Sequence, residues 1–292
     1  MKKSIVITGG AGFVGSNLIK CLLKKTKYNL ISIDNYSSGS HKNHIKSKRV
    51  SYIKSDTQNI NKVLKNPKKI HSLFHFGEFS RIYQSFLKME ECINSNTIGS
   101  NAVINFCFSN NIKLIYSATS ATIGNKGNDK NLSPYAFTKA KNLELLENLK
   151  KWFKFKSEII YFYNVYGPNQ ISSGSMATVI GIFEDLYKKK RPLTVVRPGT
   201  QSRRFTHIDD TVNVCYFAWK QNKCRHYSIS NRESYSILEV AKMFQSKIKL
   251  LSPRRGERFA SALTSMNLSN KVYKIFGKVR LKVYIKNLIK SQ

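Results

Sequence analysis

Short apolar runs alternate with amphipathic stretches through the first half of the chain. The apolar runs are rich in Ile, Val, Leu and Phe, which is typical of buried strands, and they predict strands over residues 5–7, 30–33, 50–53, 72–76, 113–116 and 158–162. The stretches between them carry apolar residues three or four positions apart, which predicts helices over residues 16–25, 60–64, 94–108 and 134–153. On the last helix, the face expected to point inward comprises Leu143, Leu146, Leu149 and Trp152. This alternation predicts an α/β fold with a doubly wound parallel sheet, in which ligands bind beyond the carboxyl ends of the strands.

Glycines follow the first predicted strand at once. Gly10, Gly12 and Gly15 have the spacing G-x-G-x-x-G, and Asp34 ends the next strand. In such a turn we expect Gly10 to permit the tight bend, Gly12 to let the backbone approach a pyrophosphate, and Gly15 to let the helix pack closely on the sheet. The helix N-terminus presents free N–H groups to phosphates. A carboxylate at position 34 can accept a hydrogen bond from a ribose 2′-OH, whereas it would repel a 2′-phosphate. The order of these elements therefore predicts a dinucleotide site that prefers NAD to NADP.

The alternation weakens after residue 164, where Gly167-Pro168 and Ser172-Ser173-Gly174 indicate loops. A helix is predicted over residues 176–189, a short strand over 193–196, and shorter mixed elements after that. We therefore expect an NAD-binding domain of the Rossmann type at residues 1–165 and a smaller α/β substrate lobe at residues 166–292, with some strand exchange between the two.

Composition excludes several other classes of protein. The 292 residues are 41% hydrophobic, which is enough for a sizeable core. No run approaches the roughly 18 apolar residues of a membrane span. The five cysteines form no C-x-x-C pair and are odd in number, which favours reduced thiols in a cytoplasmic protein. We expect no metal site.

The formal net charge of +34 is unusually high. Most of it comes from lysines spread through the chain, without a zinc-finger, RNA-recognition or basic-zipper pattern. We therefore expect solvated basic faces rather than a specific nucleic-acid site. A positive field would still attract a dianionic nucleotide substrate.

A tyrosine and a lysine carry the candidate chemistry. Tyr135 and Lys139 form Y-x-x-x-K at the start of the long predicted helix, and this spacing puts both side chains on one face. A nearby ammonium stabilises a phenolate and would lower the pKa of Tyr135 toward working pH. The tyrosine would then be a general base.

These motifs together resemble the extended short-chain dehydrogenase/reductases, in particular nucleotide-sugar epimerases of the UDP-hexose 4-epimerase type. The resemblance covers nearly the whole chain and implies NAD as cofactor and a nucleotide-diphosphate sugar as substrate. It implies Tyr135 and Lys139 as catalytic residues, together with Thr119, or Ser120 if the following loop is one residue shorter. We also expect a homodimer.

The resemblance implies the cofactor-binding residues position by position, from the opening motif Thr8–Ser16, from Asp34-Asn35 and from His75-Phe76-Gly77. They are Gly9, Gly12, Phe13, Val14, Gly15, Asp34, Asn35, Asp56, Phe76, Gly77, Asn96, Tyr135 and Lys139.

The second half resembles the family in three segments that bind substrate. Asn164 matches the Asn of the strand and loop that ends in Tyr166-Gly167-Pro168. Arg203, in the segment Gln201–Asp210, and Arg254, in Pro253-Arg254-Arg255-Gly256-Glu257, match arginines that contact the diphosphate. The chain departs from the family at Arg204, where an Asp is usual, and in a short loop between Thr119 and Tyr135.

The family contains several reactions, and the sequence separates some of them. Dehydratases and decarboxylases place acids just after the catalytic Ser or Thr, but Ser120 and Ala121 stand there in this chain. Heptose-nucleotide 6-epimerases share a segment similar to residues 164–177, yet they carry a second catalytic Lys where this chain has Ser173. We therefore predict C4 epimerisation of a nucleotide sugar of the UDP-glucose or UDP-N-acetylglucosamine type, through a 4-keto intermediate. The alternatives are a nucleotide-sugar 4-ketoreductase and a non-catalytic NAD- or RNA-binding protein on the same fold.

The resemblance also bears on the sugar. In 4-epimerases of this family, the residue that borders the hexose 2-substituent lies seven positions after the arginine of the late loop. Counted from Arg254, this position is Ser261. A small residue there resembles the arrangement that admits an N-acetyl group. We therefore expect UDP-N-acetylglucosamine to be accepted at least as well as UDP-glucose.

Overall fold

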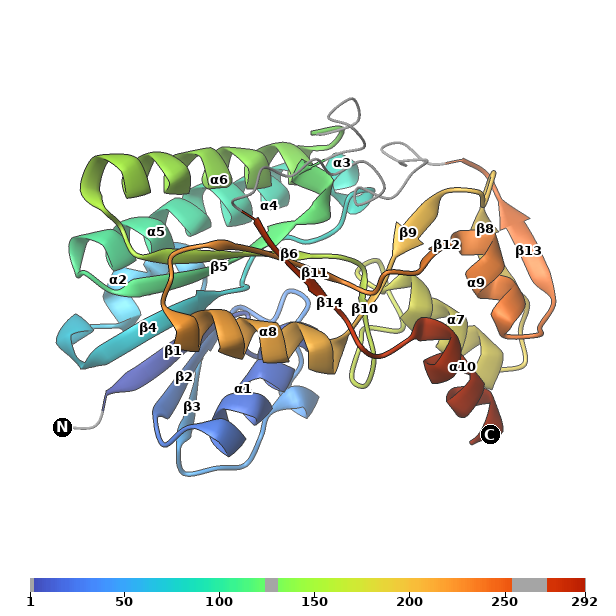
Figure 1. Ribbon diagram of the computed structural model, residues 1–292, viewed down its shortest axis with the longest axis horizontal. Coiled ribbons are helices and arrows are strands. Elements are labelled where there is room, and N and C mark those ends of the chain that lie inside the picture. The colour runs from blue at the N-terminus through green and yellow to red at the C-terminus, as the bar shows by residue number, and fades with distance from the viewer. Residues whose placement is uncertain (1–2, 124–130, 254–271, 292) are drawn as a thin grey trace.

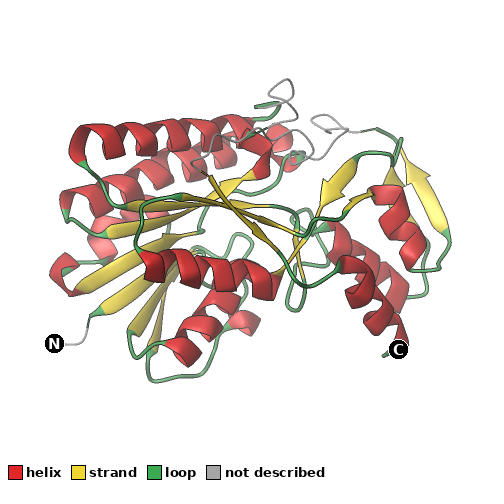
Figure 2. Ribbon diagram, viewed as in Figure 1, coloured by secondary structure: helices red, strands yellow, loops and turns green. Residues whose placement is uncertain are grey.

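The computed structural model describes residues 3–123, 131–253 and 272–291. Its centre is an eight-stranded sheet with the order β14-β11-β6-β5-β4-β1-β2-β3 (Figures 1 and 2). Every neighbouring pair in this sheet is parallel. Its strands are β1 (Ser4–Thr8), β2 (Asn29–Asp34), β3 (Val50–Lys54), β4 (Ile70–His75), β5 (Lys113–Thr119), β6 (Ser157–Phe162), β11 (His226–Ser230) and β14 (Val272–Phe276). The predicted α/β fold with a doubly wound parallel sheet is confirmed.

Helices cover both faces of the sheet (Figure 1). On one face lie α1 (Phe13–Lys25) and α8 (Ile208–Gln221), whose apolar side chains share a buried cluster with Ile5, Ile7, Phe74 and Ile160 of the strands. On the other face lie α2 (Ile60–Val63), α5 (Ser100–Ser109) and α6 (Pro134–Phe153), packed on Val6, Ile33 and Leu114. Two short helices, α3 (Gln84–Leu87) and α4 (Met89–Ile93), and a π-helical turn (Asn94–Gly99) lead into α5.

A smaller lobe with its own apolar cluster stands beyond the carboxyl ends of the strands (Figure 1). It contains the helices α7 (Val179–Lys188), α9 (Ile237–Met243) and α10 (Leu281–Lys290). Its paired strands are β8 (Leu193–Val196) with β13 (Ile248–Leu251) and β9 (Ser202–Arg204) with β12 (Ser234–Ser236). Between the lobe and the sheet, β7 (Val165–Tyr166) pairs with β10 (Thr206–His207). The second half of the chain thus supplies both this lobe and two strands of the main sheet.

The long helix α6 shows both what the apolar pattern predicts and where it fails. Its bounds match the prediction, because the Ser133 side chain caps the first turn and Lys154 ends the helix in a left-handed conformation with φ 56°. Leu146 and Leu149 are buried as expected, but Trp152 is 62% exposed. The reason is geometric: at 3.6 residues per turn, each step of three residues drifts by about 60° around the helix, so residue 152 lies about 120° away from residue 146.

In the part of the chain that the structure describes, none of the helices combines the length and the apolar character needed to span a membrane.

Candidate functional site

A cavity of about 810 Å³ opens at the carboxyl ends of the parallel strands, between the sheet and the smaller lobe. It brings together most of the residues implied by the sequence: Gly9, Gly12, Phe13, Val14, Gly15, Asp34, Asn35, Asp56, Phe76, Gly77, Thr119, Tyr135, Lys139, Asn164 and Arg203 all line it. Asn96 does not line it. Arg254 and Ser261 lie outside the described residues, so their implied roles stay predictions.

The turn between β1 and α1 is built from glycines, although not in the roles that we expected for each. The left-handed residue is Gly9, with φ +70°, and a Cβ there would lie 2.7 Å from the Phe76 carbonyl carbon. Gly10 was expected to permit the bend. Instead, a glycine is needed there for lack of room, because an added Cβ would meet the Ser32 side chain at 2.3 Å. A Cβ on Gly15 would lie 2.1 Å from the Gly9 oxygen, so the predicted close packing of the helix is what this glycine allows.

The N-terminus of α1 fits the pyrophosphate of a dinucleotide. Gly12 caps the helix without any side-chain hydrogen bond, and the first turn contains no acid. A helix leaves its first N–H groups without partners inside the helix, and Phe13, Val14 and Gly15 at this end all line the cavity. Backbone donors and the positive end of the helix dipole therefore face the cavity, as anion binding requires.

Asp34 ends β2 at the same rim. Its carboxylate accepts hydrogen bonds from the backbone N–H groups of Ala11 at 2.9 Å and of Tyr36 at 2.8 Å. Burial raises the pKa of Asp34, while these backbone donors oppose the shift. Next to it, the Asn35 side chain donates to Asp56 at 2.7 Å. The ribose and adenine ends of NAD would meet these acceptors, so the cavity fits that cofactor.

Thr119, Tyr135 and Lys139 also line the cavity. Thr119 ends β5, and its hydroxyl accepts from the Ala121 N–H at 3.2 Å, which leaves its own proton for the hydrogen bond that it makes with Tyr135. Tyr135 and Lys139 lie one turn apart at the start of α6. The Thr119 hydroxyl is thus placed against the tyrosine.

The electrostatics of Tyr135 differ from the prediction. Burial raises its pKa to about 12, the hydrogen bond from Thr119 lowers it, and the nearby Glu78 charge raises it. We expected the Lys139 ammonium to lower this pKa, but that ammonium forms an ion pair with Glu78.

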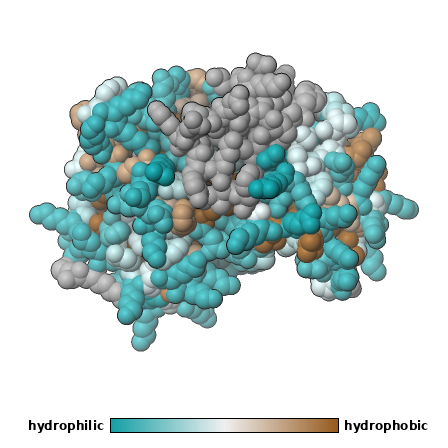
Figure 3. All heavy atoms as spheres, in the orientation of Figure 1, coloured by the Kyte–Doolittle hydropathy of each residue, from teal (hydrophilic) through white to brown (hydrophobic). Residues whose placement is uncertain are grey.

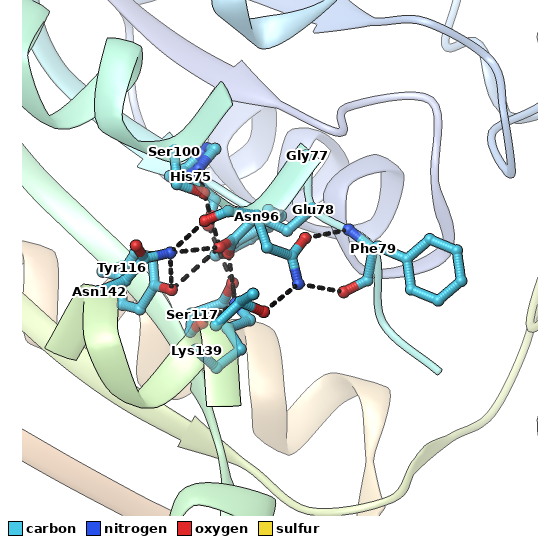
Figure 4. Close-up of polar contacts among 12 residues, drawn as sticks. His75, Gly77, Glu78, Phe79, Asn96, Ser100, Tyr116, Ser117, Lys139 and Asn142 are labelled. Atoms are coloured by element: carbon cyan, nitrogen blue, oxygen red, sulfur yellow. Dashed lines mark hydrogen bonds and ion pairs between the residues drawn. The ribbon is translucent and has the colours of Figure 1, made fainter. Parts of the chain in front are cut away.

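Glu78, which the sequence analysis did not single out, is the centre of a buried polar network (Figure 4). One carboxylate oxygen accepts from Ser100 at 2.8 Å, from Tyr116 at 2.9 Å and from Asn142 at 3.3 Å, and the other pairs with Lys139. Burial alone would raise the pKa of Glu78, but the Lys139 ammonium, His75 and the hydrogen bonds from Lys139 and Ser100 together outweigh it and hold this pKa below its usual value. Glu78 is therefore an anion inside the protein.

The same network reaches the glycine turn through His75. The ring contacts Ser100 at 3.0 Å through Nε2 and Thr8 at 2.7 Å through Nδ1. Burial lowers the pKa of His75 to about 4, so this ring is neutral at pH 7. The Thr8 hydroxyl accepts from the N–H groups of Phe76 and Gly77, at 3.2 and 3.1 Å. A continuous set of hydrogen bonds thus joins Lys139 to the strand end that carries the dinucleotide turn.

Asn96 holds Phe79 in the segment that follows β4 (Figure 4). Its side chain is fully buried, accepts from the Phe79 N–H at 2.7 Å, and donates to the Phe79 carbonyl at 3.0 Å and to Thr138 at 3.3 Å. We expected it to bind the cofactor directly, but its contacts hold the segment after β4, which lines the cavity.

Arg81 is a second residue that the sequence analysis missed. Its guanidinium donates twice to the Met176 carbonyl, at 2.9 and 2.6 Å, and so ties the segment after β4 to the second half of the chain. Arg81 also lines the cavity, and its charge acts to lower the pKa of Tyr135. The available signal was position, because Glu78 and Arg81 both follow the carboxyl end of a parallel strand, where ligands bind.

The second half contributes Asn164 and Arg203. Asn164 adopts a φ of 35° after β6 and donates to the Arg204 carbonyl at 2.8 Å. Arg203, on β9, is 9% exposed and donates to the Ser202 carbonyl at 2.8 Å. Both line the cavity. Among residues 3–123, 131–253 and 272–291, we find no cluster of His, Cys, Asp and Glu that could hold a metal ion.

Known proteins match both the sequence and the fold. The ADP-L-glycero-D-manno-heptose-6-epimerase of Brachyspira hyodysenteriae is 29% identical over 263 residues, which are 85% of this chain and 82% of that protein. The UDP-glucose 4-epimerase of Thermotoga maritima, solved with UDP-glucose, superposes with a TM-score of 0.86 at 21% identity, covering 98% of this chain and 97% of that one. The UDP-glucuronic acid 4-epimerase of Bacillus cereus, solved with UDP-glucuronic acid and NAD, gives a TM-score of 0.82 at 25% identity over 99% of both chains.

Residues 5–230 match the description of a single protein family, and this range takes in the glycine turn, Tyr135 with Lys139, and Arg203. The chain belongs to the NAD dependent epimerase/dehydratase family.

Proposed function

We propose that the protein is an NAD-dependent nucleotide-sugar 4-epimerase. The observation that carries the proposal is that Thr119, Tyr135 and Lys139 share one cavity with the glycine turn and Asp34. A positioned hydroxyl pair beside a dinucleotide site suits the removal of a proton from a sugar hydroxyl. The same pair can return the proton later.

Each of the three residues has a separate role. Tyr135, as the phenolate, takes the proton of the sugar 4-OH, and the Thr119 hydroxyl, which bonds Tyr135 in the absence of substrate, turns to donate to the same oxygen. Lys139 stands one turn along α6 and contributes an N–H donor at this end of the cavity. The glycine turn and Asp34 would hold NAD, which would supply a reversible hydride acceptor for the sugar C4.

Binding energy in this proposal resides in the nucleotide rather than in the hexose. Arg203 reaches the cavity from the smaller lobe and would pair with the diphosphate, and Arg254 stays a predicted second partner. Asn164 borders the same region. A loosely held sugar could then turn between the two hydride steps, as epimerisation requires.

Heptose 6-epimerisation is the second candidate, because one relative at 29% identity carries that name. The chain has Ser173 where those enzymes are expected to carry a second catalytic lysine. This difference favours C4 epimerisation over heptose 6-epimerisation. Thr119 is followed by Ser120 and Ala121, without the acid that elimination needs, which argues separately against a dehydratase.

The test is a product screen with purified protein. UDP-glucose, UDP-N-acetylglucosamine, their GDP and dTDP counterparts and ADP-heptose are each incubated with the protein, and epimers are separated by chromatography and identified by NMR. We expect a C4 epimer to form from one of the hexose nucleotides without net consumption of NAD. Net oxidation of NADH with a 4-keto sugar would instead identify a ketoreductase, and a C6 epimer of ADP-heptose would overturn the C4 assignment.

A further inference from the structure

The ion pair between Lys139 and Glu78 lies inside the protein but at the wall of the cavity. The Lys139 side chain is 4% exposed and the Glu78 side chain 2% exposed, yet both residues line the cavity. Burial of a charged pair carries a large desolvation cost, and an apolar pair of similar volume often leaves a protein as stable or more stable. Its presence beside the reacting groups therefore suggests a role in the site.

Glu78 is held rigidly on its own side of the pair. Ser100, Tyr116 and Asn142 donate to one oxygen, so the other oxygen is directed at the Lys139 ammonium. These donors come from α5, β5 and α6, which are all packed in the core. The carboxylate is therefore a fixed acceptor rather than a mobile side chain.

The pair also fixes where the ammonium protons point. An ammonium has three N–H donors. One is directed at Glu78 and one at the Ser117 carbonyl near the end of β5, and the third has the Ser117 hydroxyl at 3.4 Å as its acceptor. The ammonium also lies 4.6 Å from the centre of the Tyr116 ring. The contact with the Ser117 hydroxyl is the longest of these, so its N–H is the one that a ligand in the cavity could take over.

We propose that Glu78 is a positioning residue for Tyr135 and Lys139: its carboxylate fixes the ammonium against the end of β5 and offsets the positive charge beside the tyrosine. The proposal rests on the proposed function, because it concerns the same site. It predicts that the charge of Glu78 sets the pH range in which the tyrosine loses its proton.

The test uses Glu78→Gln, which keeps one oxygen for Ser100 and Tyr116 but puts a neutral amide beside Lys139. The Glu78 anion lies near Tyr135 and Lys139 and disfavours the loss of a proton from these two groups. The ascending limb of kcat against pH should therefore move to lower pH by at least about one unit, as a property of the coupled pair. Turnover at the pH optimum should fall at least roughly tenfold, because Lys139 loses its fixed position.

Three variants separate charge from structure. Glu78→Asp keeps the charge, so the ascending limb of its kcat–pH profile should lie where it does in the wild-type protein, even if turnover stays low. Tyr116→Phe removes one hydrogen bond to Glu78 and no charge, and should leave the limb in place. Glu158→Gln is the matched control, because Glu158 pairs with Lys113 in an equally buried ion pair, with side chains 0% and 9% exposed, and neither residue lines the cavity. It should lower the melting temperature without moving the limb.

A readout without turnover keeps the two proposals distinguishable. The ultraviolet absorbance of tyrosinate, taken as the difference between each protein and its Tyr135→Phe counterpart, follows the ionisation of Tyr135 alone. It should show the same downward shift in Glu78→Gln. If wild-type protein epimerises no nucleotide sugar, the proposed function fails while this titration still decides the role of Glu78. An unchanged titration in Glu78→Gln, or an equal shift in Glu158→Gln, would show that Glu78 is only structural.

Discussion

At the scale of single residues, Tyr135 combines a buried phenol with a hydrogen bond from Thr119. Tyr135→Phe removes only the hydroxyl, so the fold should persist while turnover falls by at least about two orders of magnitude, as expected for a general base. Epimer formation and the melting temperature are both measured. Tyr161→Phe is a matched control, because this tyrosine is 7% exposed and bonds His226 at 3.1 Å outside the cavity. Near-normal turnover of Tyr135→Phe would rule out the assignment.

Asp34 governs the expected choice of cofactor. Its carboxylate would repel a 2′-phosphate, so wild-type protein should bind NAD more tightly than NADP, and Asp34→Ala should narrow the difference. Titration calorimetry with both nucleotides measures this preference. Asp185→Ala, which removes an acid from α7 outside the cavity, should not change it. Equal affinities of the wild-type protein for the two nucleotides would contradict the prediction.

The sequence predicted the residues of the site better than their partners. The glycine turn, Asp34 and Tyr135 with Lys139 each depend on local spacing, and local spacing can be read from a chain. The Lys139–Glu78 pair joins residues 61 positions apart, and no local pattern indicates which acid will meet which ammonium. The pKa of Tyr135 is raised rather than lowered as predicted, first because the phenol is buried and further because the Glu78 charge lies nearby.

At the scale of elements, the apolar pattern placed the strands and helices of the first half, because each one buries a continuous stripe. It missed the start of α1, which begins at Phe13 rather than at residue 16, because glycines and a bulky aromatic there conceal the helical period. The pattern also predicted a helix from residue 176, but α7 begins at Val179, because the Thr178 side chain caps the helix by accepting from the Gly181 N–H. The β9–β12 pairing depends on contacts between distant segments, which periodicity does not reveal.

Gly15 sets how closely α1 approaches the turn. Gly15→Ala would place its Cβ 2.1 Å from the Gly9 oxygen, so the helix must move away. We expect a loss of about 1–3 kcal/mol in unfolding free energy, as for other overpacked sites, and weaker NAD binding. Denaturant titration and calorimetry measure the two effects. Lys20→Ala on the exposed face of α1 is the control and should change neither measurably. Unaltered stability of Gly15→Ala would show that the turn can relax.

At the scale of the whole molecule, the positive charge is the dominant property. The face seen in Figure 3 is largely hydrophilic, with apolar residues scattered over it. The net charge of +34 should attract a dianionic UDP-sugar, and salt should screen this attraction. The Kd for the UDP-sugar should rise at least roughly threefold between about 50 and 500 mM KCl. Uncharged uridine is the control. A UDP-sugar Kd that does not change with salt would show that the field plays no part in binding.

The expected homodimer and cytoplasmic location stay predictions. Each depends on properties beyond one folded chain, and the apolar pattern carries little information on either.

The position of β11 has a consequence for how the chain can be divided. This strand lies between β6 and β14, and α8, just before it, packs against α1. A fragment of residues 1–165 would therefore end its sheet at β6, with a row of unpaired backbone N–H and C=O groups, and would expose the apolar side of α1. Such an open edge is a template for pairing with other chains. We expect the fragment to aggregate while the full chain unfolds in a single transition; a monomeric fragment with its own sharp melting curve would contradict this.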